Sequence, residues 1–423
     1  MARGYDLLYA TAALLGSPVW GFNLLRTGKW RTDWRGRFGK REALPGDPRP
    51  TVLIHGVSVG EINATRELVR HLTREDAPPV RPVVSATTNT GIERARQLYG
   101  SDHTVVRFPF DFSWMVRRFL DAVSPDLIVL VELEVWPNLS QECRRREIPL
   151  CVINGRLSDS SYRNYRLVAP LVRPIFRNLA AAAAQTEVYA ERFADLGVPA
   201  ERVSVTDNMK WDTVRMAESV PGAEELAVAM GIDRSKPLVV AGSTGPGEEE
   251  RLIATRPPGV QLLVVPRKPE RFESVARLVG FVRRTEHPDG PGRAVDGAEL
   301  FLLDTMGELA KAYSLADVAI VGRSFAARGG SDPIEPISLG KPTVIGPHHK
   351  NFSDVVTAFR EADGITVSDT PMAAAADLLR DPERASEMAE RGRNVIRARQ
   401  GASERHAELV YRLLGSEPGG VPA

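Results

Sequence analysis

The chain has 423 residues, of which 43% are hydrophobic and 26% charged, and its formal net charge is +1. This composition is typical of a globular protein with two or three domains, and the balanced charge argues against nucleic acid as a partner. The two cysteines, Cys143 and Cys151, lack metal-ligand spacing. We therefore interpret both as buried thiols rather than metal ligands.

The amino terminus joins an apolar stretch to a basic one. Residues 5–25 are apolar with three exceptions and have about the length that spans a bilayer. Seven basic residues follow, namely Arg26, Lys29, Arg31, Arg35, Arg37, Lys40 and Arg41. Residues 1–45 are thus predicted to form a helical anchor on the inner (cytoplasmic) membrane, with the body on the cytoplasmic side. Because Gly16-Ser17-Pro18 interrupts the stretch, a kinked helix in the membrane interface or packed on the protein stays an alternative.

Short apolar runs alternate with helical patterns in the first half of the chain. The runs predicted to be strands are residues 51–55, 82–86, 127–131, 150–153, 181–185 and 202–205. Helical patterns cover residues 61–73 and continue near Thr90, after Pro137 and around Ala190. Repeated strand and helix units predict a parallel sheet covered on both faces, which is a Rossmann-like domain over residues 46–215.

A polar, alanine-rich stretch at residues 216–234 is predicted to be a linker. A second series of strands follows at residues 238–241, 261–265, 299–303, 318–321 and 342–345. It predicts a second Rossmann-like domain over residues 235–400, and residues 401–423 are expected to form a helix and a disordered tail. Two such α/β halves are expected to face each other across a cleft at the carboxyl ends of their strands.

Four polar side chains of the first half, three glutamates and one lysine, are candidates for catalysis. Glu61 opens a helix after a strand, where Ser58 and Gly60 let a substrate approach backbone amides, so it is a candidate base. A helix cap is the alternative role for Glu61. Glu132 and Glu134 alternate at the end of an apolar strand, where we expect them to share one face.

Lys210 follows the last strand of the first half. It could neutralise an anionic substrate, and a surface salt bridge is the alternative.

Four loops of the second half, each after a predicted strand, combine glycine, cations and carboxylates. Such loops together predict a nucleotide pocket, in which the turn at Ser243 would hold a phosphate and Glu335 would accept both ribose hydroxyls. The residues expected to line it are Ser243, Thr244, Pro266, Arg267, Met306, Gly307, Glu308, Gly330, Asp332, Pro333, Ile334 and Glu335.

An ordered set of motifs resembles one enzyme family. The segments are GVSVGE, VELEVWPN, INGRLSDSSY, AQTEVYAERFADLG, NMKWD, GSTGPGEEE, VPRKPERF, LDTMGELAKAYSLADVAIVG, GGSDPIEP and GPHHKNFSD. In order and spacing they are similar to the Kdo (3-deoxy-D-manno-octulosonic acid) transferases of lipopolysaccharide synthesis. The resemblance extends from the amino-terminal stretch to about residue 360.

This resemblance implies a GT-B glycosyltransferase that moves Kdo from CMP-Kdo to a lipid A precursor, lipid IVA, with inversion and without a metal or other cofactor. Glu61 matches the family's base, Glu132 an acid and Lys210 a cation that assist the transition state. The segments at residues 266–267, 306–308 and 332–335 match those that hold CMP.

The chain departs from the family pattern at three places. Gly245 and Pro246 replace a histidine and a glutamate, Ser331 and Asp332 replace a histidine and an asparagine, and Asp207 replaces a glycine. A carboxylate at Asp332 would repel a nucleotide phosphate. Two alternatives therefore stay open: an enzyme using another nucleotide sugar, as a transferase or an epimerase, and a non-catalytic, membrane-attached sugar-binding protein. The number of sugars transferred also stays open.

Overall fold

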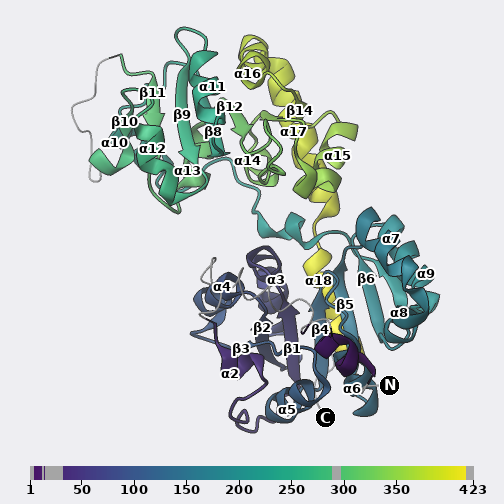
Figure 1. Cartoon of the computed structure of the whole chain (residues 1–423). Coiled ribbons are helices and arrows are strands. Elements are labelled where there is room, and N and C mark those ends of the chain that lie inside the picture. Colours follow the sequence, from purple (N-terminus) through teal and green to yellow (C-terminus); the bar gives the residue numbers. More distant parts are fainter. Residues whose placement is uncertain (1–3, 12–13, 15–31, 288–296, 416–423) are drawn as a thin grey trace. The chain divides into compact units, whose positions relative to one another are not determined.

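The computed structural model describes residues 4–11, 14, 32–287 and 297–415. It divides into two compact units, which we call unit 1 (Met1–Thr213 with Gln400–Ala423) and unit 2 (Val214–Arg399) (Figure 1). Each unit is built on a seven-stranded sheet in which every strand pair is parallel. The chain therefore has the two parallel α/β domains predicted from its sequence.

The sheet of unit 1 has the strand order β3-β2-β1-β4-β5-β6-β7. Its strands are β1 (Thr51–Gly56), β2 (Arg81–Ala86), β3 (Thr104–Arg107), β4 (Leu127–Val131), β5 (Leu150–Gly155), β6 (Ala181–Ala184) and β7 (Val203–Val205). The helices are α2 (Trp34–Arg37), α3 (Val59–Leu72), α4 (Asn89–Tyr99), α5 (Ser113–Val123), α6 (Pro137–Arg145), α7 (Asp159–Leu167), α8 (Ala169–Phe176), α9 (Glu187–Asp195), η1 (Ala200–Arg202), η2 (Met209–Thr213) and α18 (Ala402–Leu413).

Both faces of this sheet are covered, which explains why its strands are continuous apolar runs. Val52 and Ile54 of β1 pack into one core, whereas Leu53 between them packs into the other. Four helices that follow strands begin at a hydroxyl side chain that accepts a backbone N–H, at Ser58, Thr88, Ser158 and Thr186. Cys143 and Cys151 are buried and unbonded, as predicted.

The sheet of unit 2 has the order β10-β11-β9-β8-β12-β13-β14. Its strands are β8 (Leu238–Thr244), β9 (Gln261–Pro266), β10 (Val282–Arg283), β11 (Leu300–Leu302), β12 (Val318–Val321), β13 (Thr343–Ile345) and β14 (Thr366–Val367). The helices are α10 (Ala223–Met230), α11 (Glu248–Ala254), η3 (Pro269–Arg271), α12 (Phe272–Ala276), η4 (Arg284–Glu286), α13 (Leu309–Leu315), α14 (Ile334–Ser338), η5 (Lys350–Phe352), α15 (Ser353–Glu361), α16 (Pro371–Arg380) and α17 (Pro382–Arg399).

The sequence prediction of a linker over residues 216–234 is wrong. This stretch contains α10, whose Leu226, Ala227 and Met230 are buried in a core of unit 2. Alanines among polar residues suggest weak structure, but here they allow close packing against α13. At the carboxyl end, α18 returns to unit 1 and packs on α3, as the yellow ribbon in Figure 1 shows.

The predicted membrane anchor over residues 5–25 lies mostly outside the described residues. Residues 4–11 are helical, and they pack on unit 1 through polar contacts. Asp6 accepts the N–H of Ser113 at 2.8 Å, and the Tyr9 hydroxyl donates to Asp111 at 3.0 Å. Within the described ranges, no helix combines the length and the apolarity needed to cross a membrane.

Candidate functional site

The strand order of unit 1 marks the place where its ligand is expected. From β1 the chain adds β2 and β3 on one side and then crosses to add β4 on the other, so the order reverses between β1 and β4. In open parallel sheets, ligands bind at the carboxyl ends of the strands at such a reversal. Glu61 lies in the helix after β1 and Glu132 directly follows β4. The fold thus brings these two predicted residues to one edge of the sheet.

Glu61 occupies the first turn of α3, and its carboxylate is held by the residues just before the helix. One oxygen accepts the N–H of Val57 and the other accepts the Ser58 hydroxyl, both at 2.7 Å. The Ser58 oxygen in turn accepts the N–H of Glu61, so the capping role left open by the sequence is present. Burial raises the pKa of the Glu61 carboxyl above its ordinary value, and Glu132 adds to this shift. A fixed carboxyl with a raised pKa has the properties of a general base.

The prediction that Glu132 and Glu134 share one face of a strand is wrong, because β4 ends at Val131. Glu132 adopts a left-handed conformation with φ of 65°, and its N–H donates to Ile153 at 3.0 Å. Such strain in a non-glycine residue is often kept at functional sites. The three carboxyls nevertheless lie close enough to interact, because Glu61 and Glu132 both raise the pKa of Glu134, after burial as the main cause, to about 7.

Glu134 therefore belongs to the candidate site beside Glu61 and Glu132. Trp136 orients it through an N–H donated from the indole at 3.0 Å. The sequence drew attention to Glu134 only through its spacing from Glu132. That Glu134 lies near Glu61 could be seen only in the folded sheet.

Lys210 lies in η2, the turn that follows β7. Its N–H donates to Asn208 at 3.0 Å, and its side chain is half-buried. The turn η2 packs against α3, the helix that carries Glu61. The turn with Lys210 therefore lies next to the helix of the candidate base, although the turn follows β7, which is the outermost strand of the sheet.

In unit 2 the strand order reverses between β8 and β12. The predicted nucleotide-binding residues of unit 2 lie at the carboxyl ends of β8 and β9 or in the loops that follow β9, β11 and β12. These are four adjacent strands in the order β11-β9-β8-β12. The structure therefore gathers all four loops at one edge of the sheet, which separate sequence motifs could only suggest.

The pKa of the Glu335 carboxyl is strongly raised at this edge. Glu335 lies in the first turn of α14, and its pKa is raised to about 7, chiefly by burial and further by Asp332. Arg267 acts in the opposite direction. Asp332 itself accepts the N–H of Ile334 at 2.9 Å, which fixes one of its oxygens toward the backbone. Two carboxyls near one another and one cation form a site suited to hydroxyl donors.

The glycine-rich turn after β8 is not the open anion nest that the sequence indicated. The carboxylate of Glu248 accepts the N–H of Gly245 at 2.8 Å, and it also accepts the N–H of Arg323 and of Phe325. An internal anion therefore occupies amides that a phosphate would need. The prediction failed because nothing local reveals that Arg323 and Phe325 converge on this turn.

Thr244 is fully buried, and its hydroxyl donates to Glu249 at 2.6 Å. Its side chain therefore supports the loop and does not face a ligand. Ser243 next to it has a φ of 56°, and its carbonyl accepts the Ser331 hydroxyl at 3.4 Å. Ser331, one of the departures from the family pattern, thus ties the loop after β12 to the end of β8.

The remaining predicted residues differ in how they are held. Met306 is 66% exposed, and Gly307 beside it has a φ of 88°, a conformation that suits glycine. Glu308 forms ion pairs with Arg284 at 3.2 Å and Lys311 at 3.5 Å. Gly330 has a φ of 77°, and a Cβ there would lie 2.9 Å from a backbone atom of His349, so the loop needs a glycine at this point.

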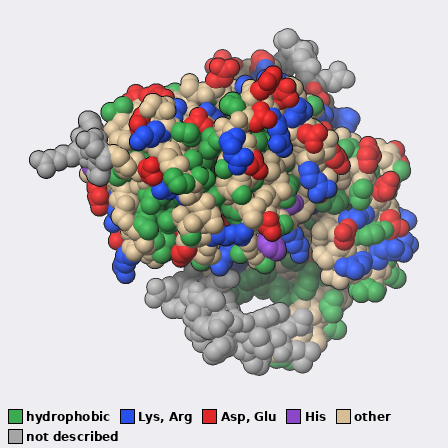
Figure 2. Space-filling model, turned by 90° about the horizontal axis from the view of Figure 1, so that it is seen from above, with side chains coloured by type: hydrophobic (Ala, Val, Ile, Leu, Met, Phe, Trp, Pro, Cys, Tyr) green, Lys and Arg blue, Asp and Glu red, His purple; other side chains and the backbone are tan. Residues whose placement is uncertain are grey.

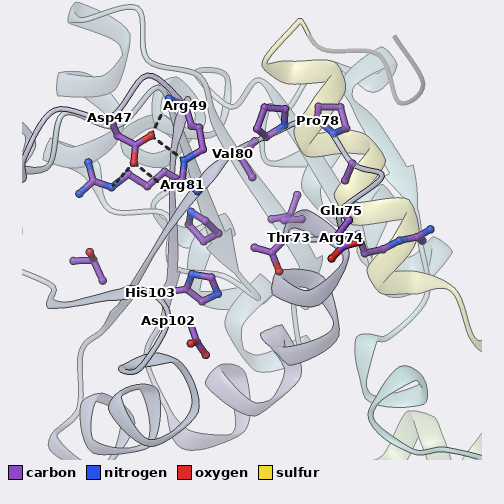
Figure 3. Close-up of a pocket in the computed structure, with 15 residues that line it drawn as sticks. Asp47, Arg49, Thr73, Arg74, Glu75, Pro78, Val80, Arg81, Asp102 and His103 are labelled. Atoms are coloured by element: carbon purple, nitrogen blue, oxygen red, sulfur yellow. Dashed lines mark hydrogen bonds and ion pairs between the residues drawn. The ribbon is translucent and has the colours of Figure 1, made fainter. Parts of the chain in front are cut away.

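A cavity of about 520 Å³ lies elsewhere in unit 1, near the start of β2 and β3 (Figure 3). Two of its arginines form ion pairs: Arg49 lies 2.7 Å from Asp47, and Arg74 lies 2.6 Å from Asp76 beside the cavity. This is the edge opposite to Glu61 and Glu132, so we do not assign the cavity to catalysis. Acidic and basic side chains are mixed over the face in Figure 2, in keeping with the balanced charge.

Within the described part of the chain, no group of three or more metal-binding side chains could hold an ion. The groups that the candidate site residues of the two units offer to a ligand are carboxyls and cations.

Comparison with known proteins agrees with the resemblance of the motifs. Residues 32–213 match a family model described as 3-deoxy-D-manno-octulosonic-acid transferase (kdotransferase). The chain is 31% identical over 431 residues to the 3-deoxy-D-manno-octulosonic acid transferase of Haemophilus influenzae, covering 97% of this chain and 99% of that protein. It is also 31% identical over 444 residues to the enzyme of the same name from Bordetella pertussis, covering 98% and 100%.

Among solved structures, UDP-GlcNAc 2-epimerase from Neisseria meningitidis, bound to UDP-GlcNAc, is similar with a TM-score of 0.56 at 13% identity, covering 86% of this chain and 100% of that one. This likeness shows the fold alone, which is that of GT-B-like glycosyltransferases and epimerases.

Proposed function

The chain belongs to the 3-deoxy-D-manno-octulosonic acid transferase family, and on this premise we propose that it transfers Kdo from CMP-Kdo to a lipid A precursor, lipid IVA, with inversion. The observation that carries the proposal is Glu61, a fixed carboxyl with a raised pKa at the reversal of the sheet in unit 1. The 31% identity to enzymes of that name, over nearly the full length of the chain, supports Kdo as the sugar that is transferred.

In the proposed reaction Glu61 removes the proton of an acceptor hydroxyl. The resulting oxygen attacks the anomeric carbon of Kdo, and the bond from that carbon to the CMP phosphate oxygen breaks, so that CMP leaves with the electron pair. Lys210 offsets negative charge that develops in the transition state, and Glu132 assists from the end of β4. No metal is required for this chemistry.

In unit 2 we assign the ribose of the donor to Glu335, because a carboxylate there can accept two hydroxyl donors. Arg267 at the end of β9 supplies a positive charge beside it. Asp332 reduces the attraction for a phosphate, so we expect the cytidine and ribose contacts to contribute more than the phosphate contacts.

The test is transfer from freshly generated CMP-Kdo to lipid IVA, read by mass spectrometry, with the Glu61→Gln variant beside the wild-type protein. We expect product from the wild type and at least about 100-fold less from the variant, because glutamine cannot take a proton. Binding of CMP to the variant should be unchanged, which controls for folding. No product from a wild-type protein that binds CMP would refute lipid IVA as acceptor, and no CMP binding would refute the donor and favour another nucleotide sugar or a non-catalytic role.

We also propose that unit 1 works at the inner membrane, on its cytoplasmic side. An exposed aromatic cluster supports this: Trp34 and Trp114 are 40% and 43% exposed, and each stacks on Phe38. Such rings favour the interface of a bilayer, and the basic residues between positions 26 and 41 favour anionic lipid.

Co-sedimentation with vesicles that contain anionic phospholipid tests the membrane proposal. The double variant Trp34→Ser, Trp114→Ser should bind at least about tenfold more weakly, because it loses apolar area at the interface. Val228→Ser, which changes a 57% exposed residue of unit 2, is the control and should bind like the wild type. Equal binding of all three proteins would refute the role of this cluster.

A further inference from the structure

The carboxyl-terminal helix α18 reaches the candidate site through a buried histidine. His406 is fully buried, and its Nε2 accepts the N–H of Asn154 at 3.1 Å. The same nitrogen lies 2.9 Å from the Thr206 hydroxyl. Because a backbone amide can only donate, Nε2 must carry its lone pair, and the Thr206 hydroxyl must be the donor. His406 is thus a neutral acceptor for two different segments of unit 1.

Asn154 continues this connection toward Lys210. Its side-chain oxygen accepts the N–H of Met209 at 3.0 Å, and Met209 is the fully buried residue next to Lys210. Asn154 is itself fully buried and has a φ of 50°, so its backbone is held in a left-handed conformation. The amide donated to His406 is part of what keeps it there.

A second path runs from Asn154 to the same turn. The Asn154 carbonyl accepts an amide N–H of Gln185 at 3.0 Å, and Gln185 accepts one from Asn208 at 3.0 Å. Asn208 then accepts the N–H of Lys210, also at 3.0 Å. The backbone on either side of the Lys210 N–H is therefore fixed by a hydrogen-bond network that starts at His406 and is buried as far as Gln185.

The start of α18 grips this turn directly as well. Asp212 accepts the N–H of Gly401 at 2.7 Å and the N–H of Ser403 at 2.6 Å. The side chain of Gln400 donates to the carbonyl of Trp211 at 3.1 Å. The turn that carries Lys210 is thus enclosed between α18 and the end of β5.

We propose that His406 is a positioning residue for Lys210, acting through Asn154 and the amide of Met209. His406 touches neither substrate; it sets the place of the cation that assists transfer. This inference rests on the proposed function of Lys210. In keeping with the geometry, burial lowers the pKa of His406 to about 3, so the ring stays neutral and keeps its acceptor at every pH at which the enzyme would work.

The test is a double-mutant cycle in the full-length protein. His406→Leu removes the acceptor while keeping a buried apolar side chain, and we expect kcat to fall about 100-fold with little change in KM for CMP-Kdo, as for a small displacement of a catalytic group. In the Lys210→Ala background the same change should lower kcat less than about twofold, because the cation it positions is gone. A loss of equal size in both backgrounds would mean general damage and would overturn the proposal.

Two further variants guard against a failure of His406→Leu to fold. Asn154→Gly removes the acceptor of the Met209 amide at a position whose φ suits glycine, so it should fold, lower kcat at least about tenfold and again have little effect beside Lys210→Ala. His406→Gln keeps an acceptor and should restore part of the activity. Tyr411→Phe, which removes only a 3.5 Å contact from α18 to His71, is the matched control and should behave like the wild type.

Hydrogen exchange separates this proposal from the proposed function, because it needs no substrate. The Met209 amide should exchange at least about tenfold faster in His406→Leu than in the wild type, and unchanged in Tyr411→Phe. Unchanged exchange at Met209 in His406→Leu would overturn the relay even if the wild type transfers Kdo. Faster exchange in a protein without transferase activity would leave the relay intact and refute only the proposed function.

Discussion

Replacing Glu335 with glutamine should stabilise the fold at neutral pH. The pKa of Glu335 rises from 4.5 to about 7 in the folded chain because the carboxyl is buried and lies near Asp332. Between these two values the unfolded chain has released the proton and the folded chain still holds it. The unfolded state therefore binds fewer protons, so the wild type loses stability as the pH rises through this window. Glutamine has no proton to lose and escapes this loss.

The magnitude follows from the two pKa values. A tenfold difference in proton affinity between the folded and unfolded chain corresponds to about 1.4 kcal/mol, so the carboxyl costs about 3 kcal/mol at pH 8 but only about 1 kcal/mol at pH 5. The free energy of unfolding of Glu335→Gln, relative to that of the wild type, should thus be about 2 kcal/mol larger at pH 8 than at pH 5. Comparing the two pH values cancels any effect of the glutamine that does not depend on pH.

Urea unfolding followed by circular dichroism measures this difference. Asp304→Asn is not a suitable control, because Asp304 is paired with Arg283 at 2.8 Å; Glu250→Gln, at an exposed position of unit 2, should show the same stability difference at both pH values. A Glu335→Gln protein whose relative stability is the same at pH 5 and pH 8 would refute the reasoning.

The same ionisation should appear in ligand binding. If the carboxylate accepts the ribose hydroxyls, CMP should bind the wild type about 20-fold more tightly at pH 7.5 than at pH 5.5. Glu335 is largely ionised at pH 7.5, whereas it is almost fully protonated at pH 5.5. Calorimetry with Glu335→Gln under the same conditions shows how much of this change comes from the phosphate of CMP. An equal pH dependence in both proteins would contradict the assignment of the ribose to Glu335.

Two predictions concern β8 and α11, the strand and the helix on either side of the glycine-rich turn of unit 2. Glu249→Gln should lower the free energy of unfolding, measured in urea, by about 3 kcal/mol, because the fully buried carboxylate pairs with Arg271 and its loss leaves that cation without its partner. Glu250→Gln, at an exposed position, is the control. An equal effect of the two substitutions would contradict this prediction. Gly242→Ala should lower the free energy of unfolding by about 1–3 kcal/mol in the same assay, because the new Cβ would lie 2.1 Å from the Tyr313 hydroxyl oxygen. Gly280→Ala, whose Cβ would have no atom within 4 Å, is the control and should change stability little. A Gly242→Ala protein as stable as the wild type would contradict this packing.

Much of the fold could be predicted from the sequence because the signal for a buried parallel strand is local. Runs such as residues 127–131 and 238–241 are apolar at every position, and the strands β4 and β8 contain them. Turn and helix signals next to these runs predicted the alternation of strands and helices, and the motifs indicated the family. Short outer strands escaped notice: β3 is only four residues long, and β10 and β14 have two each.

Local patterns do not reveal which distant groups meet in the folded chain. Glu248 fills amides of its own turn together with those of Arg323 and Phe325, so a loop that looked like a phosphate nest holds an internal carboxylate. His406 reaches Asn154 across 252 positions of sequence. The elements and the chemistry available at the strand ends could be read along the chain, since both depend on neighbouring residues. Burial and long-range contact then set which carboxyls are perturbed and which amides are occupied, because desolvation and hydrogen bonding act through space and not along the chain.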